Sequence, residues 1–190
     1  MRISFFVIIG AYVACHMLTR YLVTPVQEQF LADVTVFASL VYLPHGVRVL
    51  ATWLYGWKAI LPLALGSLLA DFLFTPAEAR DLMYPAISGS IAVGSVAAFV
   101  VFEVARLTGR NLYANDGLNM NWKCLIAVGS GASLFNSIGN SMVYKGIILP
   151  ELTLPTLGVY LVGDIIGLIV AMVVLMFAFR WARFADSAGR

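Results

Sequence analysis

The sequence predicts an all-α, polytopic membrane protein with six transmembrane helices, and two observations lead to this fold class. Hydrophobic residues make up 61% of the 190 residues and charged residues only 12%, which is about half the charged share of an average soluble domain. The apolar residues gather in six segments of roughly the length that crosses a bilayer. No stretch is long and polar enough for a soluble domain, so we expect residues 1–190 to form a single transmembrane domain.

The six predicted spans follow one another with short connections. A partly polar stretch, residues 21–33, separates the first two spans, and a longer polar loop, residues 108–121, separates the fourth from the fifth. The spans are expected at Ile3–Leu18, Val34–Tyr55, Ala59–Phe74, Met83–Leu107, Trp122–Tyr144 and from about Pro155 to Phe179.

The placement of lysine and arginine predicts the orientation in the membrane, because cytoplasmic loops carry an excess of these residues. If both termini are cytoplasmic, eight basic residues lie on the cytoplasmic side and three, Arg20, Arg80 and Lys145, lie outside. We therefore expect a multi-pass protein with both termini in the cytoplasm.

The second span carries a proline, a histidine, a glycine and an arginine within the stretch Tyr42–Thr52. Proline removes a backbone donor and glycine weakens a helix, so we expect the second helix to be broken near Pro44–Gly46. Irregular backbone at bilayer depth persists only where protein or a watery cavity covers it. The stretch therefore predicts a polar interior.

Two charged residues are expected near the middle of the membrane. At about 1.5 Å per residue, Arg48 lies roughly 12 Å and Asp164 roughly 13 Å from the ends of their spans. An Arg48–Asp164 ion pair is therefore compatible with their depths. Such a pair either serves a ligand site or simply holds the helices together, since any buried charge requires a partner.

The fifth span carries a stripe of polar residues at steps of three and four, which places them on one helix face. The stripe consists of Ser133, Asn136, Ser137, Asn140, Ser141 and Tyr144. One reading is packing, in which small and amide side chains bond across helices. The other is a cavity lining, where the amides of Asn136 and Asn140 suit a neutral or zwitterionic solute.

Several further signals bound the chemistry. Gly163, Gly167 and Ala171 form a row of small residues that favours close packing within the chain. His45 is either a ligand group, a proton acceptor or a structural residue, and its lack of a second histidine or cysteine at useful spacing argues against a metal. No catalytic motif is present, so we expect no enzymatic activity and no cofactor. The net charge of +2 is too small to favour nucleic acid.

Three short motifs, in order, resemble those of MASE1-type membrane sensor domains: YLPHGV at Tyr42–Val47, GSLLA at Gly66–Ala70 and GDIIG at Gly163–Gly167. The matching positions are Pro44, Gly46, Gly163, Asp164 and Gly167. The resemblance implies a sensory module of the bacterial inner membrane. Members usually have about eight spans and an attached kinase or cyclase, whereas this chain has six predicted spans and no output domain. A separate membrane partner would have to carry the output.

Three functions follow as hypotheses. The first is a non-enzymatic sensor or ligand-binding module with a small-molecule site lined by His45, Arg48, Asn136, Asn140 and Asp164. The second is the substrate-binding subunit of a vitamin-type uptake transporter. The third is an accessory or assembly subunit of a larger membrane complex, in which the polar residues only join helices.

Overall fold

The computed structural model describes residues 2–30, 39–114, 122–145 and 150–188, and the predicted start of the second span at Val34 lies outside them. The described part is helical and contains no β-strand, which confirms the all-α prediction. Its main helices are α1 (Arg2–Leu18), α2 (Thr24–Glu28), α4 (Leu43–Tyr55), α5 (Ile60–Phe74), α6 (Ala77–Leu107), α7 (Trp122–Val143) and α8 (Pro150–Ala188).

Four stretches of the described chain are long and apolar enough to cross a membrane: Ile3–Glu28, Leu43–Phe74, Leu82–Leu107 and Leu154–Ala178. This composition indicates a membrane protein. The count differs from the six expected spans for two reasons. Helix α7 is not among the four stretches, and the second stretch contains both α4 and α5.

Contacts between side chains show that α4 and α5 run in opposite directions. Tyr12 of α1 packs against Gly66 of α5, and four residues later His16 stacks on Phe74, so α1 and α5 are parallel. Thr19, which directly follows α1, lies at the start of α4, and Tyr12 of α1 lies beside Arg48, so α1 and α4 are antiparallel. Between α4 and α5, Gly56 reverses the chain with a positive φ of 57°, a conformation that glycine adopts without strain.

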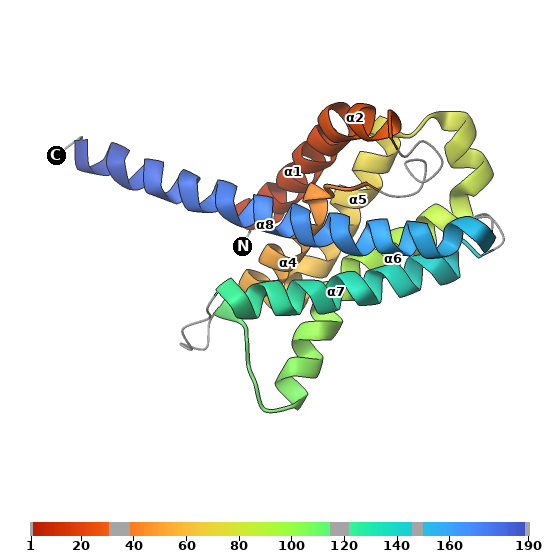
Figure 1. Cartoon of the computed structure of the whole chain (residues 1–190). Helices are drawn as coiled ribbons and strands as arrows, with labels where there is room; N and C mark the ends of the chain where they lie inside the picture. Colours follow the sequence, from red (N-terminus) through yellow and green to blue (C-terminus); the bar gives the residue numbers. More distant parts are fainter. Residues whose placement is uncertain (1, 31–38, 115–121, 146–149, 189–190) are drawn as a thin grey trace.

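The successive helices α6, α7 and α8 run antiparallel to one another (Figure 1), whereas α8 runs parallel to its other neighbour, α4. Helix α7 lies between α6 and α8, and α8 packs against α4. The C-terminal part of α8 extends past the other helices (Figure 1), and its apolar side chains there, such as Val174 and Met176, are exposed. In a membrane such side chains face lipid.

The break in the second predicted span lies just before Pro44, not within Pro44–Gly46. Helix α4 begins at Leu43, and Pro44 occupies its first turn, where a residue needs no backbone N–H. Gly46 is inside the helix, and a side chain there would collide with Ala171 of α8. The proline therefore starts this helix rather than interrupting it.

The irregular backbone before α4 obtains hydrogen bonds from three other segments. The N–H of Tyr42 donates to the carbonyl of Gly163 at 2.9 Å. The N–H of Leu43 donates to the Thr19 hydroxyl at 3.3 Å, and that of Leu40 to the Gln27 side-chain oxygen at 2.6 Å. These bonds satisfy donors that lipid could not.

Gly163 and Gly167 face this irregular segment. A Cβ atom at Gly163 would overlap the carbonyl oxygen of Ser39, and one at Gly167 would overlap that of Tyr42. The two glycines thus serve packing within the chain, with α8 lying directly against the backbone that leads into α4.

Two apolar clusters fill the interior of the described part of the chain. One joins α4, α6, α7 and α8 around Val49, Phe102, Val128 and Leu168. The other joins α1, α4 and α5 around residues such as Tyr12 and Leu63. The first cluster closes the interior on the side where α4, α6 and α8 continue toward their C-terminal ends.

Candidate functional site: a polar network beneath an open cavity

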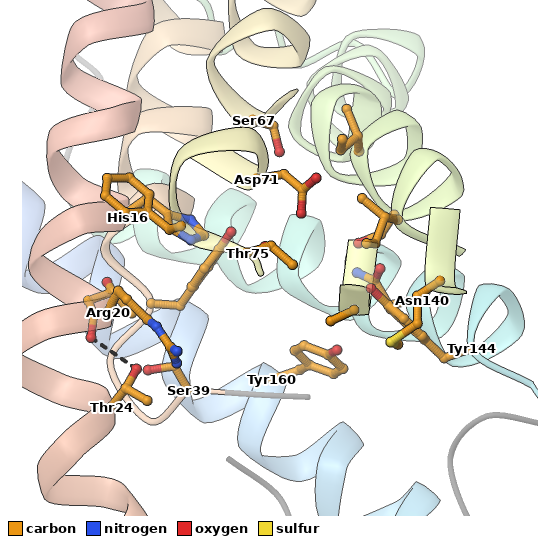
Figure 2. A pocket seen from close by; sticks show the side chains of 18 of the residues that line it. His16, Arg20, Thr24, Ser39, Ser67, Asp71, Thr75, Asn140, Tyr144 and Tyr160 are labelled. Carbon is orange, nitrogen blue, oxygen red and sulfur yellow. Dashed lines mark hydrogen bonds between the residues drawn. The ribbon is translucent and has the colours of Figure 1, made fainter. Parts of the chain in front are cut away.

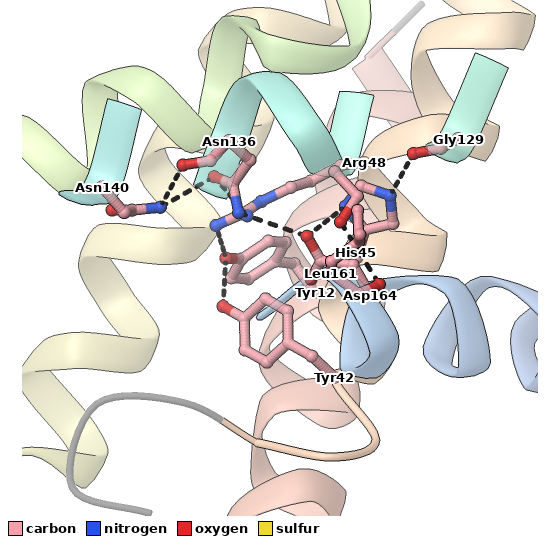
Figure 3. Close-up of polar contacts among 10 residues, drawn as sticks. Tyr12, Tyr42, His45, Arg48, Gly129, Asn136, Asn140, Leu161 and Asp164 are labelled. Atoms are coloured by element: carbon pink, nitrogen blue, oxygen red, sulfur yellow. Dashed lines mark hydrogen bonds and ion pairs between the residues drawn. The ribbon is translucent and has the colours of Figure 1, made fainter. Parts of the chain in front are cut away.

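The structure brings all five predicted site residues into one network of polar contacts (Figure 3). His45 and Arg48 come from α4, Asn136 and Asn140 from α7, and Asp164 from α8. Each is at most 6% exposed. The three-to-four-residue spacing within α4 and α7 explains why both members of each pair face the same interior.

Asp164 contacts His45 and Asn136 rather than Arg48, so the expected Arg48–Asp164 ion pair is wrong. Its Oδ2 atom lies 3.3 Å from His45 Nδ1, within ion-pair distance although not aligned as a hydrogen bond. The same oxygen accepts a hydrogen bond of 3.3 Å from the Asn136 amide. Depth along the two helices fits a pair, but the Asn136 side chain of α7 occupies the space between the two charges.

The Asn136 amide connects the two charges with matching polarity. Its nitrogen donates to Asp164, and its oxygen accepts from Arg48 Nη1 at 3.5 Å, at the outer limit of a hydrogen bond. A neutral amide thereby faces each charge with the opposite end of its dipole.

His45 is fixed by contacts on both sides of its ring. Nε2 lies 3.1 Å from the carbonyl oxygen of Gly129, and Nδ1 faces Asp164. The ring therefore links α4 to both α7 and α8. This arrangement favours a structural role for His45 in joining three helices.

Arg48 is a buried cation surrounded by neutral groups. Its Nη2 donates to the Tyr12 hydroxyl at 2.7 Å, and the guanidinium lies 5.5 Å from the ring centre of Tyr12 and 5.4 Å from that of Tyr42. Gly94 of α6 leaves space for it, since a Cβ there would lie within 2.9 Å of the guanidinium nitrogens. Of the five N–H groups of an arginine, three have no acceptor among the described residues.

Asn140 extends the network along α7. Its amide nitrogen donates to both the backbone oxygen and the side-chain oxygen of Asn136, at 2.9 and 3.0 Å. These two acceptors fix which end of the amide faces them. The Asn140 Oδ1 atom is buried and has no hydrogen-bond partner among the described residues.

A cavity of about 550 Å³ lies above this network, at the end of the bundle where α1, α5 and α7 end and α4, α6 and α8 begin. Figure 2 shows side chains from these elements surrounding the space. Arg48, Asn136 and Asn140 line it, whereas His45 and Asp164 are not among its lining residues. A cavity of roughly 300–1,000 Å³ with a few convergent polar groups has the size of a small-molecule site.

Several lining residues were not expected from the sequence. Tyr42, Asp71 and Tyr160 contribute to the wall, and Tyr12 holds Arg48 from beside it. Tyrosines and acids near the ends of spans usually lie at the membrane interface. Their residue types therefore did not indicate a cavity. The unusual feature of Tyr12 is its position in the middle of an apolar span.

The described residues contain no group of three histidine, cysteine, aspartate or glutamate side chains that could hold a metal ion. Comparison of the chain with family models, curated proteins and solved structures gave no match.

Proposed function

We propose that this chain is a non-enzymatic, MASE1-like module of the bacterial inner membrane that binds a small polar solute and acts through a separate membrane partner. The buried Arg48 guanidinium is the observation that carries the proposal. A charge at this depth is costly unless it is paired. Arg48 has no ion-pair partner among the described residues and faces a cavity with unused donors.

Six membrane crossings with both termini in the cytoplasm are part of this proposal. Alternating helix directions support six crossings, and the polar stripe of α7 accounts for its low hydropathy, because that face turns inward. In this orientation the cavity opens to the outer side of the membrane. A solute from outside would therefore reach Arg48 directly.

The closed base of the cavity supports a binding role over passage by the chain alone. Below the polar network, Val49, Phe102 and Leu168 pack without exposure. The module would need a partner, either to transmit a signal or to open a path. An uptake-transporter subunit therefore remains the second candidate, supported by the same one-sided cavity.

The proposal is tested on the full chain purified in detergent. Mass spectrometry of extracted small molecules, together with melting-temperature shifts across a metabolite library, should identify a solute that Arg48→Gln no longer binds. Arg106→Gln is the matched control, because Arg106 pairs with Glu103 at the opposite end of the bundle and does not line the cavity. Wild-type protein that carries no solute and is stabilised by none would contradict the proposal and favour the accessory role.

The partner decides between the two binding functions. Cross-linking in intact membranes followed by purification should retrieve a histidine kinase or a cyclase if the module is a sensor. Retrieval of ATPase subunits instead would assign it to an uptake transporter.

A further inference from the structure

The charged groups around the cavity balance one another. Arg48 and Arg20 line it together with Asp71 and Glu28, and His16 adds a ring without a fixed charge. Arg20 and Glu28 are exposed, whereas Arg48 is buried and Asp71 is half-buried. Arg48 and Asp71 are therefore the cation and the anion that face the inner part of the cavity, and their charges sum to zero.

The two inner charges lie along one wall. Arg48 donates to the Tyr12 hydroxyl, which in turn donates to the Ser67 hydroxyl at 3.2 Å. Asp71 follows Ser67 by one turn of α5, about 6 Å along the helix axis. Asp71 thus lies beyond Ser67 from Arg48, toward the end of α5, and Figure 2 shows its side chain directed into the cavity. The Asp71 carboxylate forms no ion pair with any described side chain.

A second acceptor lies on the opposite wall. Asn140 is one of the residues that line the cavity, and its Oδ1 atom is buried and has no partner among the described residues. Because Asn136 fixes the Asn140 amide nitrogen, the free atom is an acceptor rather than a donor. The cavity therefore offers guanidinium donors at its base and acceptors from Asp71 and Asn140.

From this arrangement we infer that the ligand is a small zwitterion of the amino-acid or dipeptide class, with its carboxylate on Arg48 and its ammonium group on Asp71 and Asn140. The inference rests on the proposed function and specifies its ligand. A simple anion would leave the Asp71 carboxylate without a counter-charge. A simple cation would leave the Arg48 guanidinium without one. A zwitterion pairs both as it displaces their water.

The test measures melting temperature and binding for the detergent-purified full chain with defined probes. These are the twenty standard amino acids, the ω-amino acids from glycine to 6-aminohexanoate and a set of dipeptides. Each responding compound is compared with its N-acetyl and carboxamide derivatives, which keep one charge only. We expect a zwitterion to bind at least tenfold more tightly than either derivative.

Asp71→Asn should abolish that preference, so that the zwitterion and its N-acetyl derivative bind equally. Glu78→Gln is the matched control, since Glu78 is an exposed acid near the same end of the molecule that does not line the cavity. Equal binding of zwitterion and N-acetyl derivative by wild-type protein would overturn the inference but leave the proposed function standing. The same holds if no probe binds while another solute is found on the purified protein. Absence of any solute would remove both.

Discussion

Two neighbouring layers of the interior differ completely in polarity although the same three helices build them. The polar layer consists of His45, Asn136 and Asp164. The apolar layer consists of Val49, Ala132 and Leu168. Each apolar residue lies four positions from its polar counterpart on α4, α7 or α8, and so on the same helix face one turn away.

This difference shows that polarity in the bundle changes along the helix axes as well as around them. Periodicity identifies which face of a helix turns inward, but both layers share that face. The boundary between them coincides with the base of the cavity, because Arg48 and Asn136 line the cavity and Val49 does not. The apolar layer therefore limits how far a solute can enter.

The largest expected effect comes from breaking the polar layer. Asp164→Ala removes the carboxylate that faces His45 and accepts from the Asn136 amide, and leaves the buried Arg48 charge without the anion to which Asn136 links it. The loss of stability should be about 3–5 kcal/mol. Detergent-denaturant unfolding in mixed micelles measures this. With His45→Ala added, the loss should be smaller than the sum of the two single losses. Losses that add within about 0.5 kcal/mol would mean that the layer does not act as a unit.

A comparable but smaller effect is expected in the apolar layer. Leu168→Ala leaves a cavity at a fully buried position and should cost about 3 kcal/mol in the same unfolding measurement. Val174→Ala on the exposed part of α8 is the control and should change stability by less than about 0.5 kcal/mol. Equal losses at the two positions would show that α8 buries its C-terminal part as well.

Gly94→Ala tests whether the space beside Gly94 is needed for the Arg48 guanidinium. The added methyl group would lie 2.5–2.9 Å from guanidinium atoms, so we expect a loss of about 1–3 kcal/mol together with weaker solute binding. Gly10→Ala is the control, because nothing lies within 4 Å of that position. A Gly94→Ala protein as stable as the control would show that the guanidinium moves aside, so that Gly94 does not hold it in place.

The smallest effect concerns the two charges that do not touch. A double-mutant cycle between Arg48→Ala and Asp164→Ala should give a coupling energy of about 0.5–1 kcal/mol. This is smaller than the coupling between His45 and Asp164, because Arg48 and Asp164 interact only through the Asn136 amide. Coupling larger than that of His45 with Asp164 would indicate a direct ion pair.

The helical fold and the shared inward face of the polar residues follow from composition and periodicity. Which polar side chains contact one another does not follow from the sequence. Similar depths for Arg48 and Asp164 do not reveal that a side chain of a third helix lies between them. The break before α4 was expected two to four residues too late, since proline is as suited to starting a helix as to ending one. Asp71 lies one turn from the end of α5, where an acidic residue has no unusual meaning until the neighbouring helices are placed.

The dependence of α4 on distant segments has a consequence for biosynthesis. The Tyr42 N–H before this helix and the side chains of His45 and Arg48 find partners in α7 and α8, which leave the ribosome about a hundred residues later. Until α7 and α8 are synthesised, His45 and Arg48 lack these partners and lie in lipid or beside the insertion machinery. A polypeptide that stops before Pro150 is therefore expected to be recognised by cellular proteases and to turn over faster than the finished chain, as pulse-chase labelling would measure.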